Sequence, residues 1–262
     1  MKDLVLIKIG GSLITDKRKR EKARLDVINS LASEIKPFVK KKKLIVAHGG
    51  GSFPHYPAKE YRVNEGILNK DSLKGFCLTN DAAARLNRIV VKAFLNAGIN
   101  AISIQPSAFM LCKHGEVICG DVRVIKEALK NRIVPVPYGD AAFDTFKGIT
   151  IISTEQILAH LALKLKAKKI IVAGIVDGVY TSDPFSDPSA KIIPRITKEN
   201  FPKIKGMLSG SHGVDVTGGM LSKVEELVAL SRKGIKSQII GAEKNGNLKR
   251  AILGHRVGTI IG

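Results

Sequence analysis

The chain has 262 residues and a formal net charge of +20, from 43 basic and 23 acidic side chains. Its length fits one large α/β domain or two small ones, and 44% hydrophobic residues can form a sizeable core. The charge favours an anionic partner, but aromatic residues make up only 5% and tryptophan is absent, which argues against base-stacking sites for nucleic acid.

Apolar runs of strand length alternate along the chain with longer stretches of helical periodicity. The first part is expected to hold a strand over 4–9, a helix over 23–39, a strand over 44–47, an irregular charged flap over 56–72, a helix over 75–97 and a strand over 101–104. The rest is expected to hold a hairpin over 109–118, a helix over 122–130, a strand over 133–136, a second hairpin near 147–148, a helix over 154–165, a strand over 169–173, a turn-rich segment over 177–205, a helix over 217–232 and strands over 237–240 and 257–261.

This order predicts a single α/β domain, a three-layer αβα sandwich with a mainly parallel central sheet. Ligands of such sheets bind beyond the carboxyl ends of the strands. Glycines gather at three of these expected ends, and a fourth pair opens a helix. They are Gly10 and Gly11, the run 49–51, Gly139, and Gly218 with Gly219.

Other features restrict where the protein works. The three cysteines form an odd number without metal-binding or CxxC spacing, which argues against a disulfide framework. The N-terminus lacks a signal-peptide pattern, and no apolar run approaches the roughly 18 residues needed to span a bilayer. We therefore expect a soluble, cytosolic protein with no membrane partner.

The most informative stretch is the glycine run 49–51, which follows an apolar strand and is flanked by His48 and His55. Glycine allows close approach of a ligand to exposed backbone N–H groups, so the loop is suited to phosphate. His55 adds a donor that can carry charge, while His48 is expected to orient the loop. The run is not a Walker A motif, and Pro54 stands where a dinucleotide-binding fingerprint has its third glycine.

Three lysines accompany these glycines. Lys8 lies on an apolar strand, where an unpaired ammonium group would be costly to bury. Lys17 follows the first glycine turn, and Lys223 lies about one turn into the helix that Gly218 and Gly219 open. Taken singly, each could be a solvated surface lysine. Together they could surround one anionic centre with positive charge and helix-terminal N–H groups.

Four motifs resemble the amino acid kinase superfamily, and the resemblance covers nearly the whole chain. They are residues 8–12 (KIGGS), 48–51 (HGGG), 177–180 (DGVY) and 215–223 (DVTGGM, two residues, then Lys223). Three features resemble the branch that phosphorylates isopentenyl phosphate. They are His55, the segment 103–107 (SIQPS) and the segment 208–211 (LSGS).

The resemblance implies transfer of the γ-phosphoryl group of ATP, with Mg²⁺, to isopentenyl phosphate in isoprenoid biosynthesis, by a homodimer. Residues 1–150 would form the acceptor side and 151–262 the nucleotide side. The acceptor is a phosphate monoester whose second pKa is about 6, so it is a dianion at neutral pH and needs no general base. Catalysis should then rest on positioning and electrostatic stabilisation.

The resemblance also implies residue roles. Lys8, Lys17, His55 and Lys223 would be catalytic, and Glu155 could organise the lysines. The residues implied to bind the acceptor are Gly50, Gly51, His55, Gly139 and Phe76, with Leu78 and Ala82 beside Phe76 around the isoprenoid tail or in ordinary core. The residues implied to bind the nucleotide are Lys8, Gly10, Gly11, Asp177, Tyr180, Asp183, Gly218 and Lys223. No side chain is implied as a metal ligand.

Two departures from the family pattern stand beside these roles. Pro54 fixes φ and removes an N–H just before His55, so it could pre-set or shift the histidine. Residues 153–156 read Ser-Thr-Glu-Gln where the family usually has Ser-Gly-Asp-Asp. Two alternatives stay open: a kinase of the acetylglutamate or fosfomycin type, and a non-catalytic, basic nucleic-acid-binding protein on the same scaffold.

Overall fold

The computed structural model describes residues 3–209 and 219–262. Six strands form the central sheet in the order β10-β12-β11-β9-β1-β2. β1, β2, β9 and β11 run parallel, whereas β12 is antiparallel to β11 and carries β10 at the edge. The strand bounds are β1 Leu4–Ile9, β2 Lys43–His48, β9 Lys169–Gly174, β10 Arg195–Ile196, β11 Lys236–Gly241 and β12 Thr259–Ile261.

A parallel pair, β3 (Ala101–Ile104) and β6 (Val134–Pro137), extends this sheet beyond β2. The link is a parallel bridge between His48, the last residue of β2, and Tyr138, which directly follows β6. The expected mainly parallel sheet is confirmed. Most of its strands begin and end within a residue or two of the predicted bounds, because the apolar runs that predicted them are the buried strand segments.

The two expected hairpins pair into a separate sheet in the order β5-β4-β7-β8. Its strands are β4 Met110–Lys113, β5 Glu116–Gly120, β7 Asp140–Asp144 and β8 Gly148–Ile152. Both turns use positive φ, at His114 and Gly115 in the first and at Gly148 in the second. The Asp144 carboxylate accepts backbone N–H bonds from His114 and Gly115 and from Phe146 and Lys147, so it holds the two turns together.

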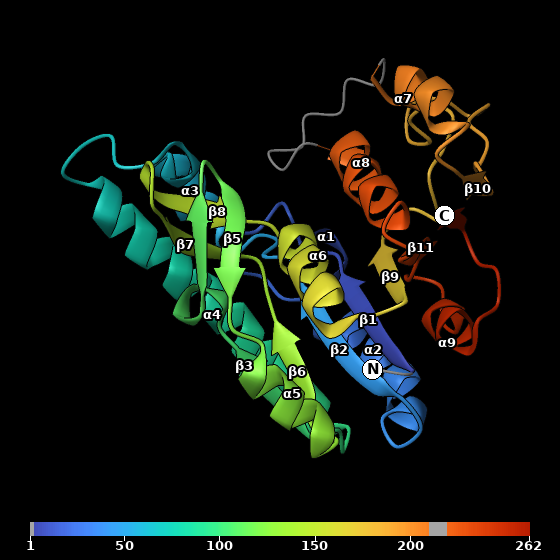
Figure 1. Ribbon diagram of the computed structural model, residues 1–262, viewed down its shortest axis with the longest axis horizontal. Coiled ribbons are helices and arrows are strands. Elements are labelled where there is room, and N and C mark those ends of the chain that lie inside the picture. Colours follow the sequence, from blue (N-terminus) through green and yellow to red (C-terminus); the bar gives the residue numbers. More distant parts are fainter. Residues whose placement is uncertain (1–2, 210–218) are drawn as a thin grey trace.

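Helices cover both faces of the central sheet and complete the expected three layers (Figure 1). One face packs against α2 Leu25–Ile35, α4 Ser72–Asn96 and α9 Asn247–Leu253. The other packs against α5 Arg123–Lys130, α6 Thr154–Leu165, α7 Phe201–Ser209 and α8 Gly219–Ser231. Because strand side chains alternate, Leu4 and Leu6 enter the second layer's core, and Lys8 lies on that same face.

The segment 56–72 differs from the expected irregular flap. It contains most of α3 (His55–Glu60) and a 3-10 turn over Val63–Glu65. Pro54 has helical backbone angles and precedes the first turn of α3, where a missing N–H costs nothing. Two other short helices, α1 (Gly11–Ile14) and α9, also carry too little periodicity to be predicted. Within 3–209 and 219–262, no helix is both long and apolar enough to cross a membrane.

Candidate active site

Two glycine turns lie against each other where β1 and β2 end. A Cβ on Gly11 would stand 2.3 Å from the backbone nitrogen of Gly51, and Gly51 itself has a φ of +54°. The Thr15 hydroxyl donates to the Gly11 carbonyl over 2.8 Å and accepts from the Ser52 N–H over 3.0 Å. The two turns are therefore in backbone contact and share one hydroxyl, which leaves no room for larger residues at either glycine.

Pro54 closes the second turn and starts the helix that carries His55. A Cβ on Gly50 would meet the Pro54 ring at 2.2 Å, so the ring packs directly on that glycine. His55 is then the first residue of α3; it is half-buried and lines a cavity beside the glycines. The departure at Pro54 thus has a local structural reason, since the ring supports both the turn and the helix start.

His48 lies on the opposite side of the loop and is fully buried. Its Nδ1 donates to the Gly49 carbonyl, its Nε2 accepts from the Asn87 amide over 3.0 Å, and its ring stacks on Tyr138. Burial lowers the pKa of His48 to about 4, so the ring is neutral at physiological pH. A neutral, hydrogen-bonded ring in this place supports the loop and does not face the cavity.

Lys8 forms a buried ion pair with Glu155, the second residue of α6. The Lys8 Nζ and Glu155 Oε1 atoms are 3.0 Å apart, and the two side chains are 9% and 12% exposed. Burial by itself raises the pKa of Glu155, but the charges of Lys8 and Lys223 outweigh it and lower the pKa below the usual value. Glu155 is therefore ionised, and its negative charge balances the positive charge of Lys8, which β1 places next to the glycine turn.

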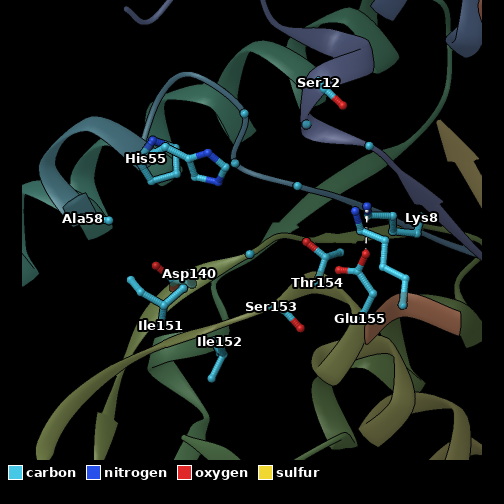
Figure 2. Close-up of a pocket in the computed structure, with 18 of the residues that line it drawn as sticks. Lys8, Ser12, His55, Ala58, Asp140, Ile151, Ile152, Ser153, Thr154 and Glu155 are labelled. Atoms are coloured by element: carbon cyan, nitrogen blue, oxygen red, sulfur yellow. Dashed lines mark ion pairs between the residues drawn. The ribbon is translucent and has the colours of Figure 1, made fainter. Parts of the chain in front are cut away.

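Two cavities meet at the lysines. The first contains the glycines 49–51 and His55, and the second extends along the carboxyl ends of β9 and β11. We name them the acceptor-side cavity and the nucleotide-side cavity, after the ligands that the sequence leads us to expect there. Both are lined by Lys8, Gly10, Ser12, Lys17 and Lys223. The three predicted lysines thus stand at the junction. Figure 2 shows His55 and the Lys8–Glu155 pair on opposite sides of the acceptor-side cavity.

Beyond the glycines 49–51, the acceptor-side cavity is lined by Ala58, Thr79, Ile151 and Ile152, with Gly139 beside them. Phe76 is not among its lining residues. It packs on Phe143 with 5.0 Å between ring centroids, in a small core with Val63 and Ile149. Ala82 lies in a core cluster and Leu78 is exposed. None of the three predicted residues lines the acceptor-side cavity, whereas Thr79 of the same helix does.

The nucleotide-side cavity contains most of the predicted nucleotide residues. Tyr180 and Asp183 line it with Gly10, Lys8 and Lys223, whereas Gly11 lines only the acceptor-side cavity. Asp177 is not a lining residue and instead pairs with Lys244 over 3.0 Å. Gly218, the rest of the stretch 215–218 and residues 210–211 of the LSGS segment lie outside the described residues.

The altered stretch 153–156 keeps one acid at the lysines and uses its other residues structurally. Ser153 and Gln156 form a capping box, with reciprocal side-chain-to-backbone bonds that start α6. The Thr154 hydroxyl donates to the His48 carbonyl over 3.0 Å and so ties this helix start to the end of β2. Glu155 forms the ion pair with Lys8, and Gln156 caps the helix.

Two cavity-lining acids were not predicted, Asp140 and Glu226. Asp140 is 2% exposed and accepts bonds from the Asn80 amide and the Ser107 N–H, so the SIQPS segment is fastened to the cavity wall through it. Burial raises the pKa of Asp140 to about 6. Asp140 could have been predicted as a site residue from the sequence, because it directly follows Gly139 near an expected strand end. Glu226 follows Lys223 by one helical turn.

Fold, glycine turns and lysine junction together define a small-molecule kinase of the αβα type. The model of the amino acid kinase family matches residues 3–241, and the chain belongs to that family. It is 38% identical to the isopentenyl phosphate kinase of Methanothermobacter thermautotrophicus, over 97% of each chain. It is 31% identical to that of Arabidopsis thaliana, over 84% of this chain and 72% of the relative. An X-ray structure of isopentenyl phosphate kinase covers 99% of this chain and is itself covered completely, with a TM-score of 0.85 and 35% identity.

Proposed function

We propose that the protein transfers the γ-phosphoryl group of ATP to isopentenyl phosphate and releases isopentenyl diphosphate and ADP. The observation that carries this proposal is the junction of two cavities at Lys8, Lys17 and Lys223, with His55 beyond it on one side. A phosphoryl group that passes between two anions needs positive charge where the two meet, and the lysines supply it. The name shared by the relatives points to the acceptor.

The family resemblance implies the individual roles, and the positions of the residues around the two cavities support them. Lys8, held by Glu155, contacts the transferred group, Lys17 lies near the acceptor-side phosphates, and Lys223 binds the nucleotide phosphates. His55 donates a hydrogen bond to the acceptor phosphate, which the backbone N–H groups of the glycine loop also contact. No side chain needs to remove a proton, because the acceptor oxygen is already ionised at neutral pH. The protein contributes orientation and charge.

The two halves of the chain divide the ligands between them. The acceptor-side cavity is lined largely by residues before 155, and the nucleotide-side cavity largely by residues after 171. We therefore assign the first half, about 1–150, to the acceptor and the second half, about 151–262, to the nucleotide. Lys8, Ser12 and Lys17 cross this division, as expected of groups that contact the transferred phosphoryl group.

Mg²⁺ belongs to this proposal as part of the nucleotide substrate. Within 3–209 and 219–262, no group of three or more His, Cys, Asp or Glu side chains is arranged to hold a metal ion. Mg²⁺ keeps several waters and binds nucleotide phosphates readily, so it can arrive on ATP. The homodimer and the cytosolic location stay predictions from the sequence and are tested by light scattering and by localisation in cells.

Steady-state turnover on an acceptor panel tests the function. We expect ADP formation with isopentenyl phosphate and none with acetylglutamate or fosfomycin. Turnover restricted to acetylglutamate or fosfomycin would reassign the acceptor within the same family. Absence of turnover on all acceptors, together with nucleic-acid binding that weakens steeply with salt, would instead favour a binding protein on this scaffold.

A further inference from the structure

Glu226 is an acid of the site that the roles above do not use. It lies on α8 one turn after Lys223 and lines the acceptor-side cavity together with Lys8 and Glu155. Its Oε2 atom is buried and has no hydrogen-bond partner within the part of the chain that the structure describes. A buried carboxylate oxygen in that state is unfavourable, so the group must bind a proton or a ligand must change its surroundings.

Four charged side chains on α6, β5, β1 and α8 act on Glu226. Glu155 on α6 and Glu116 on β5 oppose its ionisation, while Lys8 on β1 and Lys223 on α8 favour it. Burial, followed by the two acids, raises the pKa of Glu226 to about 7 despite the lysines. Glu155 is therefore the ionised member of this carboxyl pair, and Glu226 is the member that exchanges a proton near neutral pH.

We propose that Glu226 is a proton-binding positioning residue of the phosphate site: nucleotide phosphates that bind between Lys8 and Lys223 bring one proton onto its carboxyl group, and its ionised form weakens their binding. This inference rests on the proposed function as an ATP-dependent kinase. The proton comes from solvent, forms an O–H bond on Glu226, and no bond of the nucleotide breaks.

The sign of the effect follows from charge. The incoming phosphates are negative, so they raise the affinity of Glu226 for a proton, and the neutral carboxyl no longer repels them. An ionised Glu226 would also compete with the phosphates for the ammonium groups of Lys8 and Lys223. Nucleotide affinity should thus fall as the pH rises through 7, and proton uptake on binding should be larger at pH 8 than at pH 6.

Isothermal titration of the protein with a non-hydrolysable Mg·ATP analogue, in buffers of different ionisation enthalpy, measures both quantities. From pH 6 to pH 8 we expect the wild-type Kd to rise at least about fivefold, and that of Glu226→Gln to change less than about twofold beyond any shared trend. The variant should lose roughly half a proton or more of uptake at pH 8. Glu225→Gln, whose carboxylate pairs with Lys205 on the exposed side of the same helix at 2.8 Å, should behave as wild type.

A second measurement avoids dependence on the variant's fold. Carboxyl ¹³C resonances of glutamate-labelled wild-type protein report the pKa of Glu226 directly. The Glu226 resonance is assigned by its absence from the spectrum of Glu226→Gln. The pKa of Glu226 should rise when the analogue is added. Unchanged proton uptake in Glu226→Gln, or a Glu226 resonance that does not respond to nucleotide, would overturn the inference.

The nucleotide-binding measurements need no acceptor. The proposed kinase function and the proposed role of Glu226 can therefore be disproved independently. Nucleotide binding without turnover on isopentenyl phosphate would remove the proposed acceptor and leave the Glu226 result standing. Turnover with no difference between Glu226→Gln and wild type in proton uptake would remove only the role of Glu226. Failure to bind nucleotide at any pH would overturn both.

Discussion

Lys8 and Glu155 form an ion pair of 3.0 Å at the junction of the two cavities, and both side chains are nearly buried. The pair joins the first strand to a helix that starts almost 150 residues later, and it holds the lysine ammonium in one place. Glu155 stands where the family usually has the shorter aspartate, and its longer side chain still reaches the lysine. The replacement of aspartate by Glu155 is therefore compatible with an ion pair to Lys8.

Under the proposed function, Glu155→Gln should lower kcat about 100-fold, because Lys8 would lose the negative charge that positions its ammonium group at the transferred phosphoryl group. Glu155→Asp keeps the charge on a shorter arm and should retain more activity than the glutamine variant. Steady-state kinetics with both substrates measure this. Glu243→Gln, which removes a carboxylate from an exposed pair with Arg24, is the matched control and should leave kcat unchanged. Equal kcat values for Glu155→Gln and wild type would contradict the assigned role.

His55→Ala should lower kcat/KM for isopentenyl phosphate about 100-fold, since a hydrogen bond to a charged phosphate is lost. The KM for ATP should change little, because His55 does not line the nucleotide-side cavity. His255→Ala, at an exposed position after α9, is the control. A loss shared equally by both substrates would place His55 at the nucleotide instead.

Gly51→Ala should lower the free energy of unfolding by about 1–3 kcal/mol and abolish most activity, because it forces a side chain into a left-handed backbone position. The new methyl group would also stand 2.1 Å from the Thr15 hydroxyl oxygen. Gly206→Ala in α7 provides the control, since within 3–209 and 219–262 no atom outside its own helix backbone lies within 4 Å of the added Cβ, and φ is not positive. That change should leave stability equal or slightly higher. Urea unfolding of both variants gives the comparison.

Stability should fall between pH 6.5 and pH 4 partly because of His48. Its folded-state pKa of about 4 lies below the ordinary value of 6.5, so the unfolded chain binds more protons in this window and the free energy of unfolding falls as the pH falls. Over the whole pH range, this pKa difference of His48 contributes about 3 kcal/mol to the free energy of unfolding. His48→Gln should be less stable than wild type at pH 7 and show a shallower loss towards pH 4. An identical pH slope in the two proteins would mean that His48 is not buried neutral.

The sequence carried enough information to predict the central sheet and the gathering of the glycines and lysines in one place. The apolar run of β1 with Lys8 near its end, the glycine turns and the lysine after Gly219 are local patterns, and the structure brings these residues together at strand ends and a helix start. The hairpin turns at Gly115 and Gly148 were likewise predicted from the sequence. Both turns need a residue with positive φ, and glycine adopts that conformation without steric cost.

The apolar lining of the acceptor-side cavity and the surroundings of Glu226 depend on packing between distant segments, which no local sequence pattern records. Phe76 and Thr79 lie one turn apart on α4, and periodicity does not say which of them meets a cavity. The segment 56–72 decides it, because Tyr61 and Val63 cover the Phe76 side in a small core. In the same way, Glu226 reads as an ordinary helix acid until α6 and β1 bring Glu155 and Lys8 beside it.

The single Thr15 hydroxyl that binds both glycine turns gives the site a fixed length. Neither turn can slide without breaking a bond to the other, so the spacing between the two turns stays constant. Under the proposed function, the acceptor phosphate at the second turn and the transferred group at the first turn would therefore be held at one separation in every catalytic cycle.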